Sequence, residues 1–268
     1  MKRKHERMVV WMGMAIFLAL STLTRSPQVE AQSVLTLDLI KYGLRDRVQA
    51  SGYITSKPIP CLGNIVGGRD QMVNFSEGEV VYIELLAERQ VKAGDRFPVI
   101  RLGKFVTDPQ TGKKFGNLLL IAGELVILEE GRKKVVSARI EKSYRSINIG
   151  DQIIPPEKAI PAAIPLRTAK KIEGAVIATQ ETVENISQNE IIFINRGSQD
   201  GVIVGNLFSI YKLGYFAEDA LTGKNVRLPL IKAGEAVVVS VQEETSAAIV
   251  TLSSQGFSIG DKVISDAE

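Results

Sequence analysis

The sequence predicts a mainly β protein with two tandem small antiparallel β-barrel or sandwich domains, joined by a Pro-rich linker. Three observations predict this fold class. The chain repeats itself at a fixed offset, each copy holds short runs rich in Val, Ile, Phe and Tyr between turn residues, and helical periodicity is weak. Runs of this length and composition are typical of strands. A helix is expected in the N-terminal signal segment.

The first 31 residues have the layout of a secretory signal peptide. A basic segment (1–7) precedes an uncharged apolar run (8–20), and Val29 and Ala31 occupy the small-residue positions before a cleavage site. The apolar run is shorter than the roughly 20 residues that a membrane-spanning helix needs. We therefore expect cleavage after Ala31 and an exported, periplasmic protein. An uncleaved membrane anchor is the alternative.

The composition of the remaining chain argues against an enzyme. The only histidine and the only tryptophan, His5 and Trp11, lie in the signal segment, with five of the 33 basic and two of the 30 acidic residues. The rest therefore has 28 residues of each charge, so it carries no basic footprint for nucleic acid. It also lacks histidine, the commonest general base and metal ligand. We expect no catalytic residues, no cofactor and no metal; a Ser-Lys dyad is the enzymatic alternative, without a supporting motif.

The single cysteine, Cys61, limits redox and metal chemistry further. It can form neither a zinc site of the Cys/His kind nor an internal disulfide. We interpret it as a small buried apolar residue, the usual place of a free cysteine. An intermolecular bridge or a reactive thiol is the alternative.

An internal duplication sets the domain boundaries. Residues 79–128 align with 190–239 without a gap and share 17 of 50 positions, where chance would give roughly three. After one small deletion, 147–154 align with 257–264. Copy one is therefore 48–154 and copy two 172–265. The linker, 155–171, holds four of the ten prolines and predicts an extended connection. The extension 32–47 lies outside the repeat and predicts a short helix or an extra strand.

The stretch GSQDGVIVGN (197–206) poses a choice between a phosphate-binding loop and a turn. Phosphate loops end at the start of a helix, whereas a strand-like run follows here. The matching stretch of copy one keeps only Gly94 of the three glycines. We therefore predict a turn, in which Gly supplies positive φ and Asp bonds to the nearby backbone.

A second turn element recurs in both copies with one spacing. Its Asp can accept from nearby backbone N–H groups and its Gly can take the left-handed conformation. We interpret it as a structural turn signature; a ligand site that uses its Thr and Lys is the alternative. The eight residues are Asp108, Thr111, Gly112 and Lys113 in copy one, and Asp219, Thr222, Gly223 and Lys224 in copy two.

Copy two resembles a known family through the ordered elements IFINRGSQDGVIVGNLFSIYK, DALTGK and IGDKVI. It looks like the C-terminal domain of the flagellar assembly protein T family, and like paired modules of uncharacterised exported bacterial proteins that often carry LysM modules. The resemblance covers 174–264 well and 79–154 more loosely. It implies a small β-barrel in a periplasmic protein that helps build a ring around the flagellar basal body. This chain lacks the family's other domains and any LysM sequence, and has a second copy instead.

Two functional hypotheses follow. The first is a non-catalytic exported cell-envelope protein that acts as a protein-interaction or assembly module, with flagellar association as one setting and an envelope protein or itself as partner. The alternative is a peptidoglycan- or glycan-binding envelope protein. Its sugar-binding platform would have to use tyrosines such as Tyr144, Tyr211 and Tyr215, which at strand positions more often serve packing.

Overall fold

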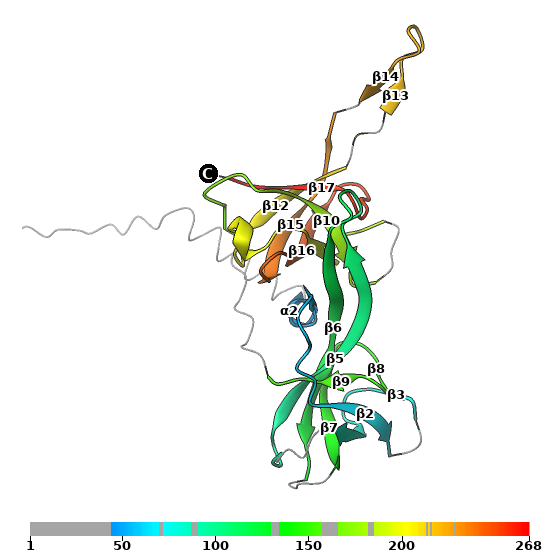
Figure 1. Ribbon diagram of the computed structural model, residues 1–268, viewed down its shortest axis with the longest axis vertical. Helices are drawn as coiled ribbons and strands as arrows, with labels where there is room; N and C mark the ends of the chain where they lie inside the picture. Colours follow the sequence, from blue (N-terminus) through cyan, green and yellow to red (C-terminus); the bar gives the residue numbers. More distant parts are fainter. Residues whose placement is uncertain are drawn as a thin grey trace, which may run out of the picture.

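Two β-barrel modules follow one another along the long axis of the protein in the computed structural model (Figure 1). The structure describes residues 44–69, 72–86, 91–129, 134–156, 166–181, 185–212, 214, 216–227 and 229–267. The predicted signal peptide and residues 157–165 of the predicted linker lie outside this part of the chain. Within it, no helix has the length and apolar character needed to cross a bilayer.

The first module is a closed barrel of six antiparallel strands in the order β6-β5-β9-β2-β4-β7, and the β6–β7 pairing closes it. The short strand β1 adds to the outer part of β6, and β3 pairs with β8 beside the barrel. The strands are β1 (Tyr53–Thr55), β2 (Gly63–Gly68), β3 (Asn74–Phe75), β4 (Val80–Leu85), β5 (Arg96–Thr107), β6 (Lys114–Ile127), β7 (Val135–Ser143), β8 (Ile147–Asn148) and β9 (Gln152–Ile153).

The second module closes in the order β10-β11-β16-β15-β12-β17, with β10 pairing back to β17. Matched through the repeat, the two barrels have the same cyclic order, so the prediction of two tandem small β-barrels is confirmed. The strands are β10 (Glu173–Thr179), β11 (Ile191–Ile194), β12 (Leu207–Lys212), β13 (Phe216–Glu218), β14 (Asn225–Arg227), β15 (Ile231–Val241), β16 (Ser246–Ser253) and β17 (Lys262–Ser265).

Each barrel has its own apolar interior, because alternate residues of every strand point inward. Ile65, Ile83 and Leu125 are fully buried in the first barrel. Val176, Ile192 and Phe208, among others, fill the second. The modules are thus separate cores, and what joins them must be built from their outer surfaces.

Local segments largely take the expected form. The extension before copy one ends in a short helix, α2 (Leu44–Gln49), and its earlier part lies outside the described residues. The stretch 197–206 is a turn, as predicted: a single 3₁₀ turn, η1 (Ser198–Asp200), is followed by Gly201 at φ 89° and Gly205 at φ 96°. The next residues enter strand β12, so no helix is present to receive a phosphate.

Candidate interaction surfaces

Each module projects a β-hairpin, and the two hairpins differ in whether they contact a barrel. We define the first arm as residues 103–120, the tip-side parts of β5 and β6, and the second arm as the matching residues 214–231. The first arm runs along the second barrel, whereas the second arm with β13 and β14 stands away from both barrels (Figure 1). The first arm is docked and the second is free.

The turn signature forms the tip of both arms with nearly the same geometry. Asp108 accepts hydrogen bonds from the backbone N–H of Gln110 and Thr111 at 2.8 and 3.0 Å. Asp219 accepts from the backbone N–H of Leu221 and Thr222 at 2.8 and 3.3 Å. Gly112 and Gly223, at φ 73° and 67°, both lie in the left-handed region. The signature therefore builds a rigid tip in each arm.

Polar contacts fix the first tip to the second barrel. The Nδ2 of Asn195 donates to Oδ2 of Asp108 at 2.6 Å, and the Nε2 of Gln110 donates to the carbonyl of Gly260 at 2.7 Å. The ammonium of Lys113 pairs with Glu244 at 2.6 Å. These contacts join residues that lie far apart in the sequence.

The charge state of Asp108 reflects this docking. Burial raises the pKa of Asp108, but hydrogen bonds from Asn195 and from the backbone of Thr111 and Gln110 favour the carboxylate. The net result is a pKa below the ordinary value of an aspartate. The pKa of Asp219 is also lowered, chiefly by the hydrogen bond from the backbone of Leu221 and then by those from Thr222. These donors all belong to its own turn.

An apolar seam lies beneath the polar contacts. The first arm contributes Val106, Phe115, Leu118 and Leu120, all buried, to a cluster that also includes Ile54 of β1. The ammonium of Lys113 lies 4.9 Å from the centre of the Phe115 ring. The opposite side is the outer surface of the second barrel, which we call the covered face: Ile177, Ala178, Ile191, Phe193, Val237, Val239, Ala247 and Ile249.

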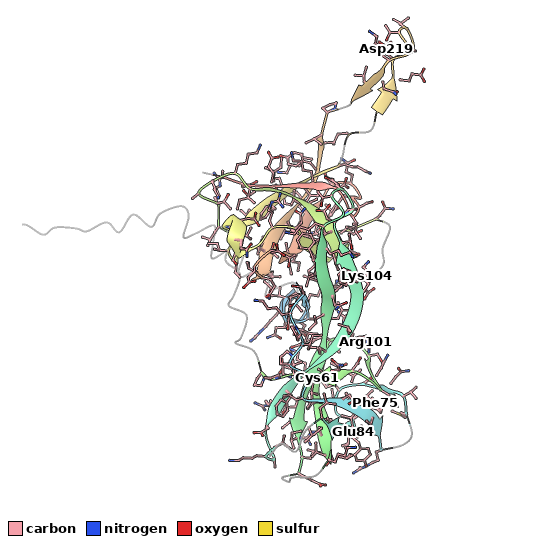
Figure 2. All side chains as sticks on the ribbon, viewed as in Figure 1. Cys61, Phe75, Glu84, Arg101, Lys104 and Asp219 are labelled. Atoms are coloured by element: carbon pink, nitrogen blue, oxygen red, sulfur yellow. The ribbon has the colours of Figure 1, made fainter. Side chains whose placement is uncertain are left out.

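The second arm exposes apolar side chains at several of the same positions. Leu221, which replaces Gln110 of the first tip, is 97% exposed. Val226 replaces Phe115 and is 50% exposed, and Ile231 replaces Leu120 and is 52% exposed. Asp219, labelled in Figure 2, marks the outermost part of this arm. The second arm thus exposes apolar side chains at positions where the first arm buries or docks its own.

Two further candidates in the described part of the chain are a metal site and the thiol of Cys61. No group of three or more His, Cys, Asp or Glu residues could hold a metal ion there. Cys61 is a free, half-buried thiol that donates to the carbonyl of Gly63 at 3.4 Å. Its predicted full burial is therefore only partly seen.

The structure describes two of the three tyrosines considered for a sugar-binding platform, Tyr144 and Tyr211. The hydroxyl of Tyr144 lies 3.1 Å from Oε1 of Gln49 and 3.2 Å from Oε1 of Glu124, and burial raises its pKa. Tyr211 is half-buried in β12, and Tyr215 lies outside the described residues. Of the two that the structure describes, Tyr144 thus serves internal hydrogen bonding and Tyr211 is partly packed.

Sequence reasoning missed the residues that receive the first arm, above all Asn195 and Glu244. The matching positions of copy one hold Glu84 and Lys134, which differ in charge from Asn195 and Glu244. The repeat therefore does not single out these two residues. The available signal was Leu221, a large apolar residue at the position of Gln110 in the first tip.

No model of a known protein family matches the chain, and no curated protein does either. The resemblance to the flagellar assembly protein T family therefore stays a prediction, and the arguments below rest on the arms and barrels themselves.

Proposed function

We propose that the protein is a non-catalytic, exported envelope protein that acts as a protein-interaction and assembly module. The observation that carries this proposal is the second arm, which presents Leu221, Val226 and Ile231 to solvent. Its counterpart in the same chain already works as a docking element, because the first arm buries its apolar face on a barrel. Surfaces of this kind are typical of partner-binding sites.

The arm also has a defined hairpin structure in its described part. Both tips are held by the aspartate of the turn, and β13 pairs with β14 from Phe216↔Arg227 to Glu218↔Asn225. A preorganised element loses little conformational entropy when it binds. The setting that the sequence resemblance favours is assembly of a bacterial envelope structure, and the N-terminal segment favours export.

Photo-crosslinking tests the interaction directly. A photoreactive residue is placed at Leu221 in the free tip, and the control carries it at Gln110, the same position of the docked tip. In cells that express the full-length sequence, we expect intermolecular adducts from position 221 and adducts within the chain from position 110. Equal absence of intermolecular adducts at both positions would contradict the proposal.

Export and wall binding need separate measurements. Mass spectrometry of the purified protein should find Gln32 as the N-terminal residue, and an intact Met1 would contradict cleavage. Sedimentation with protein-free peptidoglycan sacculi should leave the protein in the supernatant. Salt-resistant co-sedimentation would instead support the glycan-binding alternative.

A further inference from the structure

We propose that the free second arm docks onto the outer face of the first barrel of another copy of this chain, so that copies join head to tail. The inference rests on the proposed function and names its partner. It follows from one interface already present in the chain: an arm of one module covers the barrel of the next. A head-to-tail contact between copies would use the same kind of contact, an arm against a barrel, with a different seating of the tip.

The first barrel has an exposed surface at the place where the second barrel has its covered face. Val66, Tyr82 and Leu128 correspond through the repeat to Ile177, Phe193 and Val239. Val66, Tyr82 and Leu128 are 39%, 38% and 36% exposed, and neighbouring Val135 is 45% exposed. We call these four residues the open face. Among the described residues, no arm covers it.

The strand registers support the correspondence. Tyr82 of β4 pairs with Ser137 of β7, and Phe193 of β11 pairs with Ala247 of β16. The two aromatic rings therefore stand at the same place on two barrels of the same strand order. Arg139 occupies the position of Ile249 and is exposed. The open face is therefore more polar than the covered face, as expected for a surface that is exposed to solvent before the copies associate.

The end of the open face carries one charge of each sign. Glu84 takes the place of Asn195, and Lys134 takes that of Glu244; the Glu84 carboxylate and the Lys134 ammonium lie 2.7 Å apart. The free tip carries two carboxylates, Glu218 and Asp219, and one ammonium, Lys224. Simple superposition of the docked arm would set like charges opposite each other. In the proposed contact the free tip is therefore shifted from the register of the docked tip, in a crossed pairing with Asp219 beside Lys134 and Lys224 beside Glu84.

The two surfaces cannot meet within one chain. Figure 2 shows Asp219 at one end of the long axis and Glu84 on the barrel at the other end. The contact is therefore heterologous, between different surfaces of two copies, and each added copy offers a new free arm and a new open face. Such a contact continues into a ring or an open filament.

Two variants, each with one of the two surfaces disrupted, test the proposal. Leu221→Asp blocks the arm, Tyr82→Glu blocks the open face, and Ile203→Asp, at a 54% exposed position outside both surfaces, is the control. The protein is purified from cells that express the full-length sequence, and its mass is measured over a concentration series by analytical ultracentrifugation.

We expect the wild type and the control to form species larger than dimers as concentration rises. Each blocked variant alone should dissociate at least about tenfold more readily, as expected when a central contact of an interface is lost. A mixture of the two blocked variants should form dimers and nothing larger, because each retains one working surface. A wild type that stays monomeric, or assembly that both blocked variants retain, would overturn the proposal.

A charge exchange tests the crossed pairing. Lys224→Glu should weaken assembly, and the second change Glu84→Lys in the same chain should restore it. Failure of the restored chain to assemble would overturn the first barrel as the acceptor. Adducts from position 221 to a different protein, together with a monomeric chain, would overturn this inference and leave the proposed function standing. Absence of any intermolecular adduct would overturn both this inference and the proposed function.

Discussion

The two arms share a tip sequence, a hairpin architecture and a turn geometry, yet one is buried and the other is exposed. The difference lies in what each arm meets. The first arm has the second barrel beside it and the strand β1 against its base, where Tyr53 to Thr55 pair with β6. The second arm has no such neighbour among the described residues. Local sequence thus builds the arm, and the neighbouring surface decides its role.

Gly116 shows how closely the first arm is fitted to its place. Its φ is 117°, and a Cβ there would lie 2.2 Å from the backbone carbonyl oxygen of Thr55. Only glycine allows this approach of two strands. The matching position of the second arm is Arg227. The second arm therefore does not keep the glycine that this close contact of the first arm requires.

The largest expected effect comes from the apolar anchor of the docked arm. Phe115→Ala should lower the free energy of unfolding by about 3–5 kcal/mol, because it removes a buried aromatic ring and leaves a cavity. Val226→Ala, the matched change in the free arm, should alter it by no more than about 0.5 kcal/mol. Denaturant unfolding of both variants measures the comparison. Similar losses in both arms would show that the free arm is also packed.

The next effect concerns the buried carboxylate. Asp108→Asn should destabilise by about 1–3 kcal/mol, since the buried tip loses charge-assisted bonds and Asn195 loses its carboxylate partner. Asp219→Asn should have a clearly smaller effect, because Asp219 has only its own turn to hold. Thermal unfolding of the two variants gives the ranking. A reversed ranking would contradict the role of Asp108 in docking.

The pH dependence of the same carboxylate sharpens this comparison. The pKa of Asp108 is lowered in the folded state, so its stabilising contribution is complete above the unfolded value of about 4. That contribution is lost as pH falls through the lowered folded pKa. The difference in unfolding free energy between the wild type and Asp108→Asn should therefore shrink below about pH 4. A difference that stays constant between pH 7 and pH 3 would exclude this origin.

The smallest expected effect concerns the turn glycines, whose replacement should lower the free energy of unfolding equally in both arms. Gly112→Ala and Gly223→Ala each force a side chain into the left-handed region, at about 1 kcal/mol. Neither added Cβ comes closer than 3.9 Å to another atom, so the strain is conformational only. Equilibrium unfolding should show similar losses. A markedly larger loss at Gly112 would mean that tip strain is transmitted to the interface between the modules.

The sequence by itself determined the features that depend on neighbouring residues. The duplication, the β character and the tips formed by Asp108 and Asp219 all follow from short-range pattern, because strand alternation and turn chemistry act over a few residues. The equivalent cyclic order of the two barrels also follows, once two copies of one sequence are recognised. Leu221 stands where the first tip has Gln110, but short-range pattern assigns it no role.

Only the tertiary structure decided which arm docks and what receives it. The bond between Gln110 and Gly260 joins residues 150 positions apart, and Asn195 gains its importance only because Asp108 comes to lie beside it. Such contacts depend on how two modules pack, and the tip sequence is nearly the same whether or not a barrel lies against it. The same physical rule that buries Phe115 leaves Leu221 exposed, because burial needs a surface to pack against.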